Sequence, residues 1–373
     1  MTQHIGILTA GSDVPGLNAA IRAFGKAATR AYGMEIVGFQ DGFEGLIEDR
    51  SMSIDSSDLS NILSAGGTFL GTSRREPSSS QQSDNEVELL QSALDTYQRH
   101  KLDGLVCIGG RETISTALRL SRQGINIITL PKAIDNHLPL TDLSIGYRTA
   151  LEVATEASDR QHSTAHSHHR IIIVELMGAE AGWLALSAGL AGGADVILLP
   201  EIPYDIQKIA AAVLERNRAG KRFSIIAVAE SARTLESVQF FQNAHRVNEN
   251  LRSGDDRAQV DNRLTQIEER ASGSTMLLAN RLEQLTHLDT RVTILGYLLR
   301  GGSPSATDRV LAAQLGTACA DLVARQVFGV MVAARGEGTA AVPLAEAANQ
   351  VKQVPLNHPW IEAARRVGTS FGD

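Results

Sequence analysis

Leu130-Pro131-Lys132-Ala133-Ile134-Asp135-Asn136-His137 follows an apolar run, Ile125–Leu130, that predicts a buried strand. The stretch places an acid, an amide and a histidine in the turn after that strand. In an open α/β sheet, the turns at the carboxyl ends of the strands form the edge at which ligands bind. Asp135 is therefore a candidate general base for a hydroxyl nucleophile.

Apolar runs of strand length alternate with longer helical patterns along the chain. The predicted strands are Ile5–Thr9, Glu35–Phe39, Gly104–Ile108, Ile125–Leu130, Ile171–Glu175, Val196–Leu199, Ser224–Ala229 and Arg291–Leu295. The predicted helices include Leu17–Arg30, Glu86–Arg99, Thr141–Asp159 and Ile206–Ala219. This alternation predicts an α/β fold, in which helices cover both faces of mostly parallel sheets.

The length of 373 residues is sufficient for two domains, each with its own core. We expect one domain at residues 1–140 and a second at 141–300. The C-terminal elements, residues 301–373, are expected to pack back on these two domains.

Composition excludes several classes of partner and compartment. The formal net charge of −7 argues against nucleic acid or a membrane surface as a partner, so a phosphate ligand must be bound by local arginines and backbone N–H groups. Only two cysteines occur, Cys107 and Cys319, which excludes a disulfide framework and predicts a reducing cytoplasm. No apolar run reaches the ~18 residues of a membrane-spanning helix.

Glycine or other small residues occupy five turns in which a strand leads towards a helix. These turns begin at Thr9, Gly66, Gly109, Met177 and Arg300. A single such glycine is most often turn chemistry, but five of them, several with an arginine nearby, favour phosphate binding. None is a P-loop, a Gly-x-Gly-x-x-Gly dinucleotide turn or a Gly-x-Ser-x-Gly elbow. A nicotinamide-dependent oxidoreductase is therefore disfavoured.

Four histidines lie close together, at His162, His166, His168 and His169. The first two are spaced to share a helical face, where they could bind zinc. No carboxylate follows at ligand spacing, so we interpret the segment as a polar loop or an interface.

The ordered set of turns resembles the phosphofructokinase family over nearly the whole chain. Residues 6–18, with Ala10-Gly11-Ser12-Asp13, are similar to the family's opening Thr-Ser-Gly-Gly-Asp motif, and Pro131–His137 to its Pro-Lys/Gly-Thr-Ile-Asp-Asn-Asp segment. Residues 175–178 and 295–304 are similar to its Glu-Val-Met-Gly-Arg and Leu-Gly-His-Ile/Leu-Gln-Arg-Gly-Gly motifs. The tail, residues 364–373, resembles that of the longer bacterial branch, which uses ATP or pyrophosphate. The resemblance implies two Rossmann-like three-layer domains with the active site in the cleft between them.

The resemblance also implies a reaction and a set of roles. The family transfers a phosphoryl group from ATP or pyrophosphate to the C1 hydroxyl of fructose 6-phosphate, with Mg²⁺. Asp135 matches its base, Gly11 a glycine whose N–H faces the transferred group, and Arg74 a donor-phosphate ligand. The residues that match the sugar side are Met177 and Gly178 in a sugar-contacting turn, Glu230 at the sugar hydroxyls, Arg300 at the sugar phosphate, and Arg170 and Arg291, which reach into a neighbouring subunit's site. Shared sites of this kind imply a homodimer or a homotetramer.

Donor-side positions depart from the family pattern. Arg111 stands where ATP-dependent members have an aspartate that helps to hold Mg²⁺, so no metal ligand is assigned. Glu112 replaces a glycine that leaves room for a nucleotide phosphate, and Lys132 matches the pyrophosphate pattern; both favour pyrophosphate over ATP. Further replacements are Ser12 for a glycine, Ala133 for a threonine, His137 for an aspartate, Ala179 for an arginine and Tyr297 for a histidine.

These departures leave two interpretations open. In the first, the protein is a phosphofructokinase-family phosphotransferase of glycolysis that favours pyrophosphate as donor. In the second, it is a catalytically impaired paralogue that binds a sugar phosphate as a regulatory or partner subunit, because loss of one positioned transition-state donor costs roughly 10²–10³ in rate. Arg111, His137 and Ala179 are the positions on which the second interpretation depends.

Overall fold

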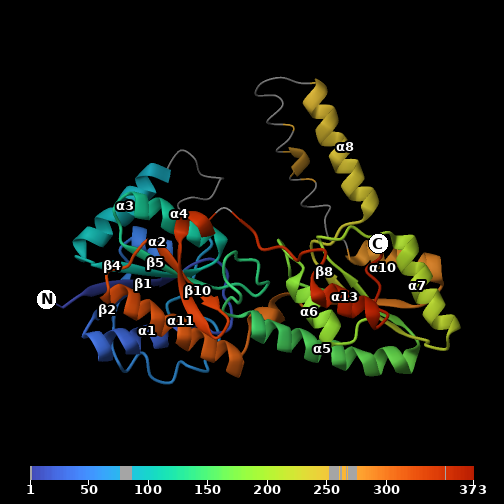
Figure 1. The fold of residues 1–373 in the computed structure, drawn as a ribbon, viewed down its shortest axis with the longest axis horizontal. Coiled ribbons are helices and arrows are strands. Elements are labelled where there is room, and N and C mark those ends of the chain that lie inside the picture. Colours follow the sequence, from blue (N-terminus) through green and yellow to red (C-terminus); the bar gives the residue numbers. More distant parts are fainter. Residues whose placement is uncertain are drawn as a thin grey trace. The chain divides into compact units, whose positions relative to one another are not determined.

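A computed structural model describes residues 2–75, 86–251, 260, 263–265, 267, 275–348 and 350–373. The chain forms two compact units (Figure 1). Unit 1 comprises Met1–Ala150 and Arg300–Lys352, and unit 2 comprises Leu151–Leu299 and Gln353–Asp373. Residues of the C-terminal part therefore belong to both units.

Unit 1 is built on a seven-stranded sheet of order β11-β10-β5-β4-β1-β2-β3. Its strands are β1 (His4–Thr9), β2 (Glu35–Phe39), β3 (Ser51–Ile54), β4 (Gly104–Gly109), β5 (Ile127–Pro131), β10 (Val330–Arg335) and β11 (Gly338–Pro343). The strands from β10 to β2 are parallel, and β3 and β11 pair antiparallel at the two edges. The central strands β1, β4 and β5 are buried along nearly their whole length, as expected for parallel strands covered on both faces.

Helices cover both faces of this sheet. They are α1 (Leu17–Tyr32), α2 (Phe43–Ile47), α3 (Glu86–Arg99), α4 (Arg111–Arg122), α11 (Ala306–Ala324) and α12 (Leu344–Ala347), together with the start of α5 (Tyr147–His168). The β1-α1-β2 and β4-α4-β5 connections run in opposite directions along the sheet. Because such crossovers are right-handed, α1 and α4 lie on opposite faces. Figure 1 shows α1 with α11 on one face and α3 with α4 on the other.

A buried carboxylate fixes the start of α5. Asp308 is fully buried and accepts hydrogen bonds from the backbone N–H groups of Gly146, at 3.1 Å, and Thr149, at 2.8 Å. It also accepts from the Thr149 hydroxyl, at 2.6 Å. The first turn of α5 thereby gains an anion at its positive end, directly after the loop that contains Asp135.

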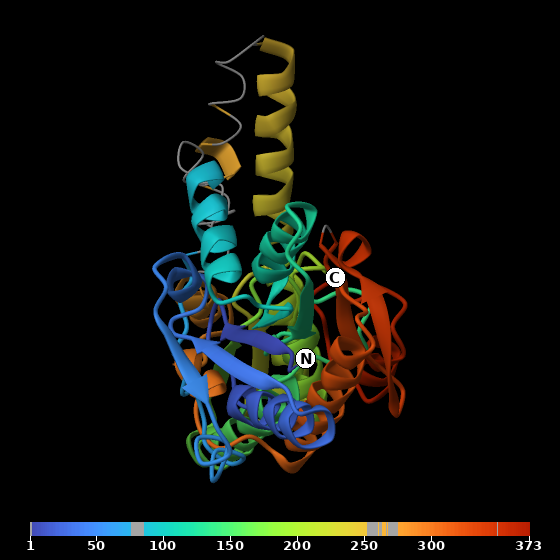
Figure 2. The same cartoon turned by 90° about the vertical axis from the view of Figure 1, so that its left-hand side faces the viewer.

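Unit 2 is built on a four-stranded parallel sheet of order β7-β8-β6-β9. Its strands are β6 (Ile171–Leu176), β7 (Val196–Leu198), β8 (Ser224–Ala229) and β9 (Thr290–Ile294). Its other elements are α6 (Trp183–Ala191), α7 (Ile206–Arg218), α8 (Leu235–Leu251), α10 (Thr275–Thr286), η1 (Gly296–Arg300) and α13 (Pro359–Arg366). Helix α6 packs on β7 and β8, and α10 packs on β9. Figures 1 and 2 show α8 extending away from this sheet.

The predicted α/β class with mostly parallel sheets is confirmed, whereas the predicted start of one helix and the loop alternative for the histidine segment are wrong. The helix expected from Thr141 begins only at Tyr147, because residues 132–146 form a closed loop. The histidine segment is helical through His168 rather than a loop. His162 and His166 contact the edge of the Phe223 ring, with centroid distances of 5.9 and 5.6 Å. Strands β3, β10 and β11 were not predicted.

In the part of the chain that the structure describes, no helix combines the length and the apolar character that crossing a membrane requires. Cys107 and Cys319 are both buried and neither forms a disulfide, and burial raises the pKa of the Cys319 thiol.

Candidate active site

The strand order of unit 1 creates a switch point between β1 and β4. The connection after β1 runs over one face of the sheet, and the connection after β4 runs over the other. At such a switch point, the carboxyl ends of the two strands border a crevice between helices on opposite faces. Thr9 pairs with Ile108, and Ala10 N–H donates to the Ile108 carbonyl at 3.0 Å. The turns that start at Gly11 and Gly110 therefore flank this crevice.

Gly11 needs to be glycine for two reasons. Its φ of +78° lies in the left-handed region, and a Cβ at this position would lie 3.1 Å from the Lys132 Nζ atom. Its N–H donates to the Ser73 carbonyl at 2.8 Å, while the Thr72 hydroxyl donates to the Gly11 carbonyl at 2.7 Å. The N–H that the family resemblance directs at a phosphoryl group is thus hydrogen-bonded to the Gly66–Arg75 loop.

Lys132 brings a buried cation to the same place. It follows β5 and is only 4% exposed, and its N–H donates to the Gly109 carbonyl at 3.1 Å. Its ammonium donates a hydrogen bond to the Ser12 carbonyl. The cation therefore lies directly beneath the Gly11 turn.

Arg111 and Glu112 are the first two residues of α4. Gly110, in an extended conformation, precedes the helix, and a Cβ there would lie 3.8 Å from the Lys132 carbonyl. Arg111 is half-buried and Glu112 is exposed. Glu112 complements the positive end of the helix, and Arg111 is a second cationic residue in the turns that follow β4 and β5. These two turns therefore supply the cationic residues Arg111 and Lys132 at the carboxyl edge of the sheet.

Asp135 lies in the loop between β5 and α5. Its Oδ1 atom lies 2.7 Å from His137 Nδ1, and the side chains of the two residues are 15% and 13% exposed. Asn136 between them has a left-handed φ of +51°, which lets both flanking side chains turn to the same side. The His137 ring thus orients the Asp135 carboxylate. The same hydrogen bond determines the tautomer of His137.

The two remaining predicted residues of unit 1 are Arg74 and Arg300. Arg74 is exposed at the end of the Gly66–Arg75 loop. Arg300 is half-buried at the end of η1. The chain just after it contacts the loop before Gly66, because the Ser303 hydroxyl donates to the Ser64 carbonyl at 2.7 Å.

The residues of unit 1 do not fit the Mg²⁺ that the family resemblance implies. Hard cations such as Mg²⁺ prefer oxygen ligands, and the expected ligand position carries the cation of Arg111. Within the described ranges, no group of three or more His, Cys, Asp or Glu side chains is arranged to hold a metal ion. No chemical step is therefore derived through this ion.

Unit 2 has a switch point of its own, between β6 and β8. Met177 and Gly178 follow β6, and Glu230 follows β8. Gly178 N–H donates to Glu230 Oε1 at 3.2 Å, and Glu230 N–H donates to the Leu176 carbonyl at 2.9 Å. Three of the predicted sugar-side residues are therefore adjacent at the carboxyl edge of this sheet.

Arg170 and Arg291 lie at the opposite edge of the same sheet. Arg170 precedes β6, and Arg291 is paired in register with Ile172 near the start of β9. Both guanidinium groups bind Asp289, Arg291 at 2.6 Å. A strand of six residues spans ~20 Å, so these arginines are too distant from Glu230 of their own unit to share one ligand with it.

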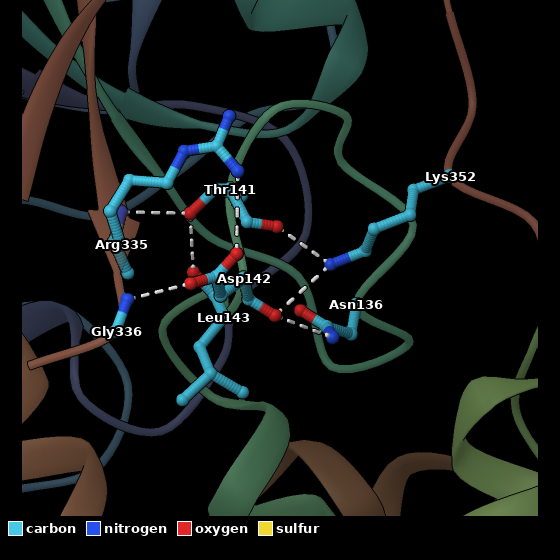
Figure 3. Close-up of polar contacts among 8 residues, drawn as sticks. Asn136, Thr141, Asp142, Leu143, Arg335, Gly336 and Lys352 are labelled. Carbon is cyan, nitrogen blue, oxygen red and sulfur yellow. Dashed lines mark hydrogen bonds and ion pairs between the residues drawn. The ribbon is translucent and has the colours of Figure 1, made fainter. Parts of the chain in front are cut away.

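Lys352 contacts the Asp135 loop and was missed in the sequence analysis. Its ammonium donates to the carbonyls of Thr141, at 2.8 Å, and Asp142, at 3.1 Å (Figure 3). Burial lowers the pKa of Lys352 to about 8. No motif marks this residue, because it lies more than 200 positions along the chain from the loop that it binds.

Known proteins are similar to this chain along its whole length. The family described as "Phosphofructokinase" matches residues 4–323. An "ATP-dependent 6-phosphofructokinase" of Propionibacterium freudenreichii is 53% identical, with 100% of both chains covered. A protein of the same name from Spirochaeta thermophila is 44% identical over 100% of this chain and 98% of its own. The crystal structure of a pyrophosphate-dependent phosphofructokinase from Marinobacter aquaeolei is similar in fold, with a TM-score of 0.78, 20% identity, and coverage of 99% of this chain and 88% of that one.

Proposed function

The chain belongs to the phosphofructokinase family, and from this premise we propose that it phosphorylates the C1 hydroxyl of fructose 6-phosphate to give fructose 1,6-bisphosphate. The observation that carries the proposal is the pairing of Asp135 with His137 in the loop after β5, the strand next to the switch point between β1 and β4. A carboxylate with a fixed orientation is the group that removal of a hydroxyl proton requires. Curated relatives that cover the whole chain are named for this activity.

Each residue of the site has a role in this reaction. The sugar's C1 oxygen attacks the terminal phosphorus of the donor, the bond to the donor's bridging oxygen breaks, and the hydroxyl proton passes to Asp135. Lys132 and Arg111 stabilise the negative charge of the donor and of the leaving phosphate. Arg74 and Gly11 join them once the Ser73 carbonyl has released the Gly11 N–H.

Four residues have sugar-binding roles in this proposal. Met177 and Gly178 form the turn against which the sugar packs. Glu230, already oriented by the Gly178 N–H, accepts hydrogen bonds from sugar hydroxyls. Arg300 binds the 6-phosphate, because its planar guanidinium can bind two phosphate oxygens at once.

We propose pyrophosphate as the donor. Glu112 places an exposed carboxylate at the first turn of α4, where it repels the additional phosphate of a nucleotide. Lys132 supplies a compact point charge under the Gly11 turn, which suits a small diphosphate. The names of the relatives favour ATP instead, so the donor has to be measured directly.

The alternative function is that of an impaired paralogue that binds sugar phosphate as a regulatory or partner subunit. It is favoured by the cation of Arg111 at the expected metal position and by the replacement of a donor-facing arginine by Ala179, which is exposed. The sugar-side contacts of Glu230 and Gly178 do not depend on these residues.

Parallel assays distinguish these functions. Purified protein would be incubated with fructose 6-phosphate and Mg²⁺, with ATP or pyrophosphate as donor. Turnover above ~1 s⁻¹ with either donor excludes the impaired paralogue, and the faster donor identifies the substrate. Absence of turnover with both donors, together with a melting temperature that fructose 6-phosphate still raises, excludes the enzyme and supports the binding subunit.

We also propose that the protein is a homodimer or homotetramer with shared sites. The support is the separation of Arg170 and Arg291 from Glu230 along the strands of one unit. Arginines at the amino edge of the sheet contribute to a site only when a second subunit presents them. Asp289 holds both guanidinium groups in place for that purpose.

A further inference from the structure

The loop that contains Asp135 is closed at its base by backbone hydrogen bonds. Ala133 N–H donates to the Ile145 carbonyl at 3.1 Å, and Ile145 N–H donates to the Pro131 carbonyl at 3.0 Å. Residues 133–145 therefore leave the sheet and return to it at one point. The position of Asp135 depends on what holds the interior of this loop.

Asn136 bridges the interior. Its amide nitrogen donates to the Asp142 carbonyl at 3.2 Å, and its amide oxygen accepts from the Ser144 N–H at 3.0 Å. Asn136 is 5% exposed and is the direct neighbour of Asp135. The Asp142 carbonyl is thus hydrogen-bonded to Asn136, the residue next to the candidate base Asp135.

Lys352 binds the same loop at three points. Its ammonium donates to the carbonyls of Thr141 and Asp142, at 2.8 and 3.1 Å, so the Asp142 carbonyl accepts from both Asn136 and Lys352 (Figure 3). Its backbone N–H donates to the His137 carbonyl at 2.7 Å. Lys352 therefore hydrogen-bonds the His137 backbone directly, and it shares the Asp142 carbonyl with Asn136, the residue next to Asp135.

The β10–β11 hairpin binds the side-chain carboxylate of Asp142. Gly336 N–H donates to Asp142 Oδ2 at 2.7 Å, and Arg335 Nη1 lies 3.4 Å from Oδ1 (Figure 3). The charged groups that act on the Lys352 ammonium are Asp142 and Arg335, of opposite sign. Asp135 and His137 are the remaining titratable groups of the loop, and Lys352 reaches that stretch through a backbone carbonyl. The Lys352 ammonium thus donates hydrogen bonds to two backbone carbonyls of the loop.

We propose that Lys352 is a positioning residue, whose ammonium fixes the 133–145 loop and thereby the orientation of the Asp135 carboxylate. The structural part of this proposal is independent of the reaction. The catalytic part rests on the proposed function, because only in a phosphotransferase does the orientation of Asp135 limit turnover.

Closure of the loop is coupled to the protonation of Lys352. Burial is the main cause that lowers the pKa of Lys352, to about 8, and Arg335 lowers it further while Asp142 raises it. The neutral amine still has two N–H donors for the two carbonyls. Because a lysine exposed by opening regains its ordinary, higher pKa, loss of the proton favours the closed state, and the loop opens less often as pH rises above about 8.

Amide hydrogen exchange tests the structural part. We expect Lys352→Met to increase the exchange of amides in residues 133–145 about tenfold at pH 7, after correction for intrinsic rates, with β1 and β4 unchanged. In wild-type protein the corrected exchange of these amides should decrease as pH rises from about 8 to about 9.5. Lys352→Arg, whose charge persists, should show no such decrease. If Lys352→Met does not fold, the wild-type titration and Lys352→Arg still decide the matter. Exchange in 133–145 that is unaffected by the substitution and by pH would overturn the proposal.

Steady-state kinetics test the catalytic part. We expect Lys352→Met to lower kcat about ten- to a hundredfold, with KM for fructose 6-phosphate changed less than about twofold, because misplacement of a catalytic group lowers the rate without removing a substrate contact. Lys208→Met, on the exposed side of α7, is the matched control with unchanged kinetics. An unchanged kcat in Lys352→Met refutes the positioning role. A wild-type protein that is inactive but shows the expected exchange refutes the proposed function and leaves the structural role of Lys352 standing.

Discussion

The backbone N–H of Gly11 donates a 2.8 Å hydrogen bond to the carbonyl oxygen of Ser73. The Thr72 hydroxyl of the same loop donates to the Gly11 carbonyl, and the Thr9 hydroxyl donates to the Gly71 carbonyl of the loop, both at 2.7 Å. The Gly66–Arg75 loop therefore occupies the donor that phosphate binding at Gly11 requires. Binding of a donor at Gly11 must displace this hydrogen bond.

Gly11→Ala is expected to destabilise the protein more than Gly33→Ala. Both positions have left-handed φ values, +78° and +63°, so both substitutions incur the backbone cost of ~1–2 kcal/mol. An added Cβ at Gly11 would lie 3.1 Å from Lys132 Nζ. An added Cβ at Gly33 would have no atom within 4 Å. Urea unfolding of both variants measures the difference, for which we expect about 1 kcal/mol. Equal losses would show that the Lys132 ammonium moves aside at no cost.

Asp135→Asn is expected to lower kcat about 10²–10⁴-fold, because the amide cannot accept the hydroxyl proton. Its oxygen still accepts a hydrogen bond from His137, so the free energy of unfolding should change by less than ~1 kcal/mol. Asp95→Asn, at an exposed position of α3, is the control with unchanged kcat. Wild-type turnover in Asp135→Asn would mean that another group accepts the proton.

Mixed oligomers test whether sites are shared between subunits. Asp135→Asn and Arg170→Ala should each be nearly inactive alone. When the two are co-expressed, a mixed dimer has one site with an intact Asp135 from one subunit and an intact Arg170 from the other. Random assembly should then restore about a quarter of wild-type activity. The control is co-expression of two differently tagged Asp135→Asn chains, and no recovery in the mixed sample would contradict the sharing of Arg170.

Arg111→Asp, His137→Asp and Ala179→Arg together should raise phosphotransfer activity. The first two supply oxygen ligands where Mg²⁺ is expected, and the third supplies a transition-state cation whose loss costs roughly 10²–10³ in rate. The measurement is kcat with ATP and with pyrophosphate, beside the three single variants. A triple variant no faster than wild type would show that these departures do not limit the rate.

Much of the fold was predictable because the pattern is local. Strands β2 and β8 begin and end where their apolar runs do, and α3 spans the predicted residues. The helix expected from Thr141 was wrong because Thr141 and Asp142 bind the distant residues Ala334 and Gly336 instead of forming a helical turn. Strand β3 is a short polar edge strand, and its pattern carries little hydrophobic signal.

Of the candidate site, residue identity was predictable and residue environment was not. Its place after a predicted strand indicated Asp135 as a candidate base, and the resemblance to the phosphofructokinase motifs indicated Gly11 and Glu230. Only the tertiary structure placed Ser73 on the Gly11 N–H, His137 on Asp135, and Lys352 on the loop between β5 and α5. The physical reason is that strand and helix periodicity is set by neighbours in the chain. The hydrogen bonds and burial that control a loop's geometry, and the pKa of Lys352, come from segments that only folding brings together.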